Sequence, residues 1–263
     1  MAVELEAAKG RAASVPLENG RMFVLKVFRF NPRATGEEPR MSVFRVPYRK
    51  GMTVLEALLW AKENVDPGLA FRYSCRMGIC GSCGMTVNGK PMLGCETQIA
   101  EFGTDVIEVG PLPNYEILRD VATDFRDFFN HHRTIRPYVI REDDEADRLP
   151  DKELLQSEEE RLAYYQFTMC IMCGLCDAAC PIVSMDKLFL GPQALSQAYR
   201  FAIDSRDTGW RERADIVDSP HGCWRCELAG SCSVVCPKGV DPELGIQLLK
   251  RLVMRRKFRT KAR

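Results

Sequence analysis

The most constraining feature of the sequence is a cysteine run that occurs twice in its second half and ends each time in Cys-Pro. The first copy, over residues 170–181, has the spacing C-x2-C-x2-C-x3-C-P. The second copy, over residues 226–237, keeps this frame but has Ala229 where its second cysteine would stand. In ferredoxins with two cubane iron–sulfur clusters, the fourth cysteine of each run ligates the cluster of the other run. The chain is therefore expected to bring two distant segments together.

Exchange of the last cysteine assigns seven cysteines to two sites. The first site has four ligands and fits a [4Fe–4S] cluster: Cys170, Cys173, Cys176 and Cys236. The second site has three ligands and fits a cubane that lacks one corner, a [3Fe–4S] cluster: Cys180, Cys226 and Cys232. Loss of one iron changes the charge of the cluster and is expected to raise its reduction potential, which suits a late electron acceptor.

Cys223 lies outside this frame, although its spacing to Cys226 is C-x2-C. It could supply a fourth ligand, or it could be a small buried hydrophobic side chain. The second interpretation is favoured because Cys223 precedes Cys226, which is the wrong side for the ferredoxin frame.

A third group of cysteines lies in the first half with the spacing C-x4-C-x2-C and one more cysteine further on: Cys75, Cys80, Cys83 and Cys95. This arrangement is typical of plant-type [2Fe–2S] sites. Gly78, Gly81 and Gly84 allow backbone N–H groups to turn toward an anionic cluster, and Arg72 and Arg76 add positive charge. A zinc site would normally use two C-x2-C pairs, and only one pair here has that spacing.

Composition limits the class of protein. The chain has 263 residues, twelve of them cysteines, and these cluster at metal-like spacings that differ from a disulfide framework, which favours a reducing compartment. The net charge of +1 gives no reason to expect a nucleic-acid partner. No apolar run approaches the roughly 18 residues of a membrane helix. With three histidines, no nucleophile–base pair and no phosphate loop, the sequence predicts electron transfer without catalytic residues in this chain.

The sequence of the first half predicts a small mixed sheet packed on one helix. Thr53 and Glu56 form a capping box that opens a helix over residues 54–63, and Asn88-Gly89 predicts a hairpin turn. Runs rich in β-branched and aromatic residues predict strands over 22–30, 42–46, 85–87, 91–93 and 106–109.

The sequence of the second half predicts an all-α structure. Helical periodicity begins with residues 114–132, and Pro192 is expected in the first turn of a later helix. The fold class is therefore α+β, with a plant-type ferredoxin domain of β-grasp type followed by an all-α domain like bacterial ferredoxins. The expected organisation is an N-terminal arm, a [2Fe–2S] domain, a helical and charged linker, a [4Fe–4S]/[3Fe–4S] domain and a basic tail, over residues 1–21, 22–113, 114–161, 162–250 and 251–263.

Two charged segments carry no predicted site. Residues 141–161 are dense in acids and bases and are expected to be a solvated connection and helix start. From Lys250 the chain has eight basic residues and no acid. This tail could lie along anionic lipid headgroups, or it could be a solvated end.

With Leu190-Gly191-Pro192 and residues 204–207, the three cysteine groups resemble the iron–sulfur subunit of succinate dehydrogenase and fumarate reductase, the succinate:quinone oxidoreductase family. The resemblance covers residues 22 to about 250. It implies a flavoprotein subunit whose FAD interconverts succinate and fumarate, and one or more membrane-anchor subunits, with haem as a further possible cofactor there. It also implies a quinone, a place in the tricarboxylic acid cycle, and a peripheral location at the cytoplasmic face of the cell membrane through the anchor.

The resemblance also implies a quinone pocket near the [3Fe–4S] ligands, with Pro181, Met185, Glu227 and Ala229 as candidate lining. Ubiquinone-reducing members typically carry Trp at the position of Met185 and His at that of Glu227. Their absence favours menaquinone. Met185 could equally be ordinary core and Glu227 a surface residue; a hypothesis is that Glu227 relays protons to the quinone.

Two alternatives remain at this point. One is the iron–sulfur subunit of another fumarate-reductase-like complex, such as a thiol-linked enzyme. Such chains usually continue into a further cysteine-rich domain, which the sequence up to Arg263 does not contain. The other is a non-catalytic scaffold stabilised by metal, which predicts no low-temperature EPR signals.

Overall fold

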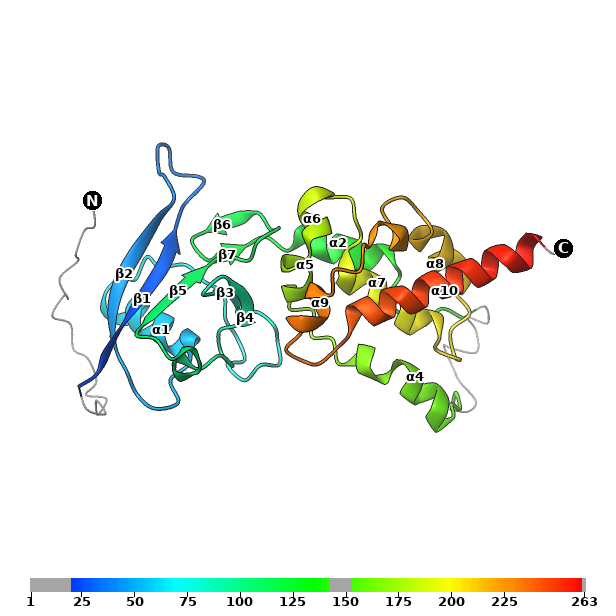
Figure 1. The fold of residues 1–263 in the computed structure, drawn as a ribbon, viewed down its shortest axis with the longest axis horizontal. Coiled ribbons are helices and arrows are strands. Elements are labelled where there is room, and N and C mark those ends of the chain that lie inside the picture. The colour runs from blue at the N-terminus through cyan, green and yellow to red at the C-terminus, as the bar shows by residue number, and fades with distance from the viewer. Residues whose placement is uncertain (1–19, 142–152, 262–263) are drawn as a thin grey trace. The chain divides into compact units, whose positions relative to one another are not determined.

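The computed structural model describes residues 20–141 and 153–261 (Figure 1). The chain forms two compact units, Met1–Asp124 and Phe125–Arg263, called here the first unit and the second unit. The division falls later in the chain than residue 113, where the [2Fe–2S] domain was expected to end. Most of the expected N-terminal arm and the middle of the charged segment 141–161 lie outside the described residues.

The first unit contains a five-stranded mixed sheet in the order β2-β1-β5-β3-β4 (Figure 1). β1 and β5 are parallel, and the other neighbouring strands are antiparallel. This is the β-grasp-like arrangement expected, and the predicted strands and helix are confirmed. The elements are β1 Met22–Arg29, β2 Arg40–Pro47, α1 Val54–Asn64, β3 Gly84–Val87, β4 Lys90–Leu93, the 3-10 helix η1 Ile99–Phe102 and β5 Val106–Gly110.

Alternating apolar side chains fix the register of this sheet. Phe23, Leu25 and Val27 of β1 are buried at every second position. On α1, Leu58 is fully buried. Burial of each such side chain contributes about 1.5–3 kcal/mol, so a one-residue slip of β1 would expose its whole buried set. Helix α1 begins as predicted, because the Thr53 hydroxyl accepts the N–H of Glu56 at 3.2 Å.

The expectation of a helix from residue 114 is wrong in its first part. Residues Ile117–Arg119 and Ala122–Thr123 form a two-stranded antiparallel sheet, β6 and β7, and the helix begins only at Arg126. The turn between the strands contains Asp120 at a φ of 50°, a backbone conformation that a right-handed helix does not contain. Its buried carboxylate accepts the N–H groups of Phe30 and Ala70 at 3.1 and 2.9 Å. Tertiary contacts therefore override local helical periodicity here.

The second unit is all-α in its described residues, as expected. Its central helix, α7, is buried along most of its length and packs against α2, α4, α5, α8 and α10 (Figure 1). Pro192 lies in the first turn of α7, as predicted. The helices are α2 Arg126–Thr134, α4 Glu158–Thr168, α5 Leu175–Ala178, α6 Pro181–Met185, α7 Gly191–Ala202, α8 Trp210–Val217, the 3-10 helix η2 Cys223–Arg225, α9 Ser231–Val234 and α10 Pro242–Lys261.

A buried ion pair joins α8 to the loop before it, and its arginine also contacts the segment after α2. The Arg213 guanidinium donates to both carboxylate oxygens of Asp207 at 2.6 and 3.0 Å, and both side chains are fully buried. Arg213 also donates to the carbonyl oxygens of Ile135, Arg136 and Tyr138. These bonds satisfy backbone carbonyl groups of the irregular segment that follows α2.

Helix α10 continues to Lys261, so most of the expected tail 251–263 is helical backbone. No Gly or Pro follows Gly245 to stop the helix. None of the helices in the described ranges has the length and apolar character that a membrane crossing requires.

Candidate iron–sulfur sites

The first site lies in the loop between α1 and β3, which carries Cys75, Cys80 and Cys83, with Cys95 following β4. The sulfurs of Cys83 and Cys95 are 3.2 Å apart. Backbone N–H groups of Met77, Ile79 and Cys80 donate to the Cys75 sulfur at 3.5, 3.3 and 3.3 Å. A loop that directs several N–H groups at sulfur is suited to thiolates and an anionic cluster.

Glycine is favoured at position 78 for two reasons. Its φ of +68° is a conformation that side chains rarely adopt, and a Cβ there would meet the Glu96 carboxylate at 1.8 Å. Its N–H donates to the Cys95 sulfur at 3.3 Å. The glycine thus brings backbone close to sulfur, as the spacing of the motif predicted.

The surroundings of two cysteines of this site shift their pKa values in opposite directions. Hydrogen bonding from Ser82 lowers the pKa of the exposed Cys80 to about 6. Burial raises the pKa of Cys83 to about 12. The Arg76 guanidinium lies 5.3 Å from the centre of the Tyr73 ring. The thiolate of Cys80 is therefore favoured at neutral pH, whereas Cys83 favours the neutral thiol until metal binds.

The two cysteine runs of the second unit have the same backbone conformation. Positive φ occurs at Met172 and Leu228, and again two residues later at Gly174 and Gly230. The second position of each pair caps a four-residue helix, α5 or α9. The two runs therefore fold alike although their sequences differ at the second cysteine. In this alignment Ala229 occupies the place that corresponds to Cys173.

One pocket of the second unit is lined by the first three cysteines of the first run together with the last cysteine of the second run: Cys170, Cys173, Cys176 and Cys236. Burial raises the pKa of Cys173 to about 12 and that of Cys176 well above its ordinary value. Neutral thiols are therefore favoured in the absence of metal, and metal binding would release their protons.

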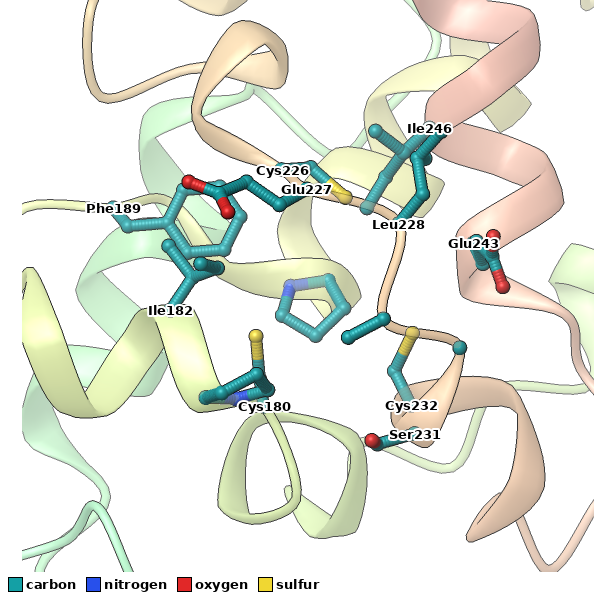
Figure 2. Close-up of a pocket in the computed structure, with 14 residues that line it drawn as sticks. Cys180, Ile182, Phe189, Cys226, Glu227, Leu228, Ser231, Cys232, Glu243 and Ile246 are labelled. Atoms are coloured by element: carbon teal, nitrogen blue, oxygen red, sulfur yellow. The ribbon is translucent and has the colours of Figure 1, made fainter.

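A second pocket is lined by the last cysteine of the first run together with two of the second run, Cys180, Cys226 and Cys232 (Figure 2). Figure 2 shows Cys180 on one side of this space, and Cys226 and Cys232 on the loop of the second run that lies opposite. Burial raises the pKa of Cys180, and it raises that of Cys232 to about 12.

The candidate quinone residues are only partly brought together. Pro181, Glu227 and Ala229 line the same pocket as the three cysteines. Met185 is not among the lining residues and is 65% exposed at the end of α6. Cys223 lines neither cysteine pocket and is fully buried within the hydrophobic core.

Two buried polar residues near the sulfurs were not found from the sequence. Asp177 lies next to Cys176, and its carboxylate is 3.5 Å from the Cys176 sulfur. Burial raises the pKa of Asp177 to about 7. Gln193 is 2% exposed at the start of α7, and its side-chain Nε2 lies 3.8 Å from the Cys170 sulfur. No local pattern marks either residue. Burial of Asp177 depends on how α5 packs against α7, and the contact of Gln193 with Cys170 depends on how the loop after α4 lies against α7.

Within the described ranges, no three His, Cys, Asp or Glu side chains are close enough to hold a single metal ion. An iron–sulfur cluster makes a different demand, since its cysteines bind different iron atoms and stand further apart. The sulfur-lined pockets and the N–H groups directed at sulfur fit this kind of group.

Family models match both units. Residues 24–130 match a 2Fe-2S iron-sulfur cluster binding domain, and residues 166–240 match a 4Fe-4S dicluster domain. Together with the fold, these matches define an electron-transfer iron–sulfur protein.

Relatives identify the family. The fumarate reductase iron-sulfur subunit of Mycobacterium tuberculosis (strain CDC 1551 / Oshkosh) is 40% identical over 227 residues, covering 86% of this chain and 91% of the relative. The succinate dehydrogenase iron-sulfur subunit of Paracoccus denitrificans is 39% identical over 232 residues, covering 88% and 87%. A chain of the Mycobacterium smegmatis Sdh1 complex in the apo form superposes with a TM-score of 0.81 at 27% identity, covering 90% and 97%. The chain belongs to the family of iron–sulfur subunits of fumarate reductase and succinate dehydrogenase.

Proposed function

We propose that this subunit holds three clusters of different type. A [2Fe–2S] cluster would be ligated by Cys75, Cys80, Cys83 and Cys95, and a [4Fe–4S] cluster by Cys170, Cys173, Cys176 and Cys236. A [3Fe–4S] cluster would be ligated by Cys180, Cys226 and Cys232. The observation that carries the proposal is the division of seven cysteines between two pockets, each of which takes sulfurs from both runs.

When bound, the clusters would supply one-electron carriers between the flavin of one partner and a quinone at another. The residues of this chain hold the thiolates in place, and backbone N–H groups of the first site neutralise part of their charge. Cys83, Cys173 and Cys232, with pKa values near 12, would each lose a proton to solvent when a cluster binds at neutral pH.

The proposed partners are a flavoprotein subunit, which carries FAD and the dicarboxylate site, and one or more membrane anchors. Exposed apolar side chains next to the cysteines support two docking surfaces. Met77 and Ile79 in the first unit are 69% and 60% exposed, which fits a surface for the flavoprotein. Met185 and Leu188 in the second unit are 65% and 64% exposed, which fits a surface for the anchor. Anchoring in this way would place the subunit at the cytoplasmic face of the cell membrane.

The proposed quinone site lies at the pocket of Cys180, Cys226 and Cys232, with menaquinone as the favoured quinone. Glu227 lines this pocket, and its side chain is 67% exposed and lies 3.6 Å from the Arg225 guanidinium. An accessible carboxylate beside the pocket could transfer protons to a reduced quinone. Pro181 and Ala229 would contribute apolar contacts there.

Glu227→Gln tests this proton transfer. We expect quinone-reductase activity to fall about tenfold or more, while reduction of a water-soluble dye by succinate is unchanged. Asp215→Asn, which removes another exposed carboxylate of the second unit, serves as the control. Unchanged quinone-reductase activity in Glu227→Gln would contradict the role of this residue.

EPR of the purified complex tests the cluster set. The oxidised complex should show the signal of a [3Fe–4S] cluster, and graded reduction should add the signals of [2Fe–2S] and [4Fe–4S] clusters. A complex without these signals, or one that contains zinc in place of iron, would overturn the proposal. It would also favour the scaffold interpretation.

A further inference from the structure

Among the polar side chains that line the cysteine pocket of Cys170, one lies within reach of a cysteine sulfur and has no role in the cluster set. Gln193, in the first turn of α7, is 2% exposed. Its Nε2 lies 3.8 Å from the Cys170 sulfur and 3.1 Å from Nδ1 of His132 on α2. The two hydrogens of one amide nitrogen can serve both acceptors.

The orientation of the Gln193 amide is informative because it leaves its oxygen without a partner. Within the described residues, Oε1 is buried and has no hydrogen bond. The opposite orientation would direct oxygen lone pairs at the sulfur of Cys170. An anionic sulfur therefore favours the observed orientation, in which the N–H groups face the sulfur and the imidazole.

The backbone holds Gln193 firmly at this place. Its N–H donates to the buried carboxylate of Asp177 at 3.2 Å, and its carbonyl oxygen accepts the hydroxyl of Ser196 at 2.9 Å. On the other side, burial lowers the pKa of His132. The neutral ring keeps Nδ1 available as an acceptor, provided that its proton is on Nε2.

We propose, on the basis of the cluster set above, that Gln193 is a positioning donor that raises the reduction potential of the [4Fe–4S] cluster through the Cys170 sulfur. Reduction adds one electron, supplied by the reductant, and makes the cluster and its sulfur ligands more negative. An N–H dipole directed at the sulfur stabilises the reduced form more than the oxidised form. His132 contributes by holding the amide in this orientation.

Gln197 provides a matched control on the same helix. It is also a buried glutamine, 4% exposed, but its Nε2 donates to the carbonyl oxygen of Phe167 at 2.8 Å. Gln193→Met and Gln197→Met make the same chemical change one helical turn apart. Only the first removes an N–H group from a cysteine sulfur.

The experiment is an EPR-monitored redox titration of the complete complex carrying each variant. We expect Gln193→Met to lower the equilibrium constant for [4Fe–4S] reduction about threefold to tenfold, which is about 28 to 59 mV for one electron. The other two clusters should keep their potentials, and Gln197→Met should leave all three unchanged. An equal shift in both variants, or none in either, would overturn the proposal.

A second measurement needs no variant. In wild-type complex labelled with 15N in its glutamine side-chain amides, spin-echo modulation of the reduced [4Fe–4S] signal should show coupling to one amide nitrogen. Absence of this coupling would overturn the proposal even if Gln193→Met fails to assemble.

The wild-type spectrum also distinguishes failure of the proposed cluster set from failure of the proposed role of Gln193. If the [4Fe–4S] signal is missing, the proposed cluster set fails, and the inference with it. If the signal is present without the coupling, only the inference fails.

Discussion

The two units hold their cysteines in different ways. In the first unit, one loop and the end of one hairpin supply all four sulfurs, and the backbone of that loop directs its N–H groups at them. In the second unit, each pocket takes sulfurs from both runs, which lie far apart in the sequence. The first site therefore depends mainly on local structure, whereas the sites of the second unit depend on the fold of the whole unit.

Removal of one cysteine sulfur from each unit tests this difference and is expected to have the largest effect. Cys236→Ser should abolish the [4Fe–4S] signal and also deplete the [3Fe–4S] cluster, because the two runs hold each other in place. Cys95→Ser should abolish only the [2Fe–2S] signal. Iron analysis and EPR of the purified variants provide the measurement. Loss of the [3Fe–4S] signal with retention of [4Fe–4S] in Cys236→Ser would show that the runs do not exchange their last cysteines.

A smaller effect is expected from the ion pair inside the second unit. Asp207→Asn leaves the fully buried Arg213 without its charged partner, which should cost about 3–5 kcal/mol in the free energy of unfolding. Denaturant unfolding, followed by circular dichroism, measures the change. Asp215→Asn is the control, because its ion pair with Arg256 is exposed and contributes at most about 1 kcal/mol. Equal losses in the two variants would contradict the structural role of Asp207.

The smallest effect is a pH dependence in the first unit. Burial raises the pKa of Asp66, but a hydrogen bond from Arg29 outweighs it, so the net pKa is lowered. The stability from this pair is therefore present above the unfolded-state pKa of about 3.9 and is lost as the pH falls further. Asp66→Asn should lower the free energy of unfolding by up to about 1 kcal/mol at pH 7, and by less at pH 3. A difference that does not shrink at pH 3 would exclude this linkage.

Local sequence patterns predicted those parts of the fold that depend on neighbouring residues. The Thr53 capping box starts α1, and the Asn88-Gly89 turn joins β3 to β4, because each pattern is satisfied within a few residues. The same reasoning failed at β6 and β7. There the buried carboxylate of Asp120 is satisfied by backbone N–H groups 90 and 50 residues away, which local periodicity cannot indicate.

Cysteine spacing predicted which cysteines line the two pockets of the second unit, because the repeated frame implies that each run gives its last cysteine to the other site. It could not indicate the polar residues beside the sulfurs. Gln193 comes close to Cys170 because the loop between α4 and α5 lies against the start of α7, and His132 reaches Gln193 from α2. Such contacts tune a cluster, and they require the three-dimensional structure.

The most direct test of the account is Mössbauer spectroscopy of the complex with 57Fe in this subunit. The account predicts about nine iron atoms per chain, in three subspectra of relative area 2:4:3. Subspectra in the ratio 2:4:4 would show a complete cubane at the site of Cys180, Cys226 and Cys232, and would contradict the assignment of Ala229 as the missing corner. A chain with little iron would contradict the whole cluster set.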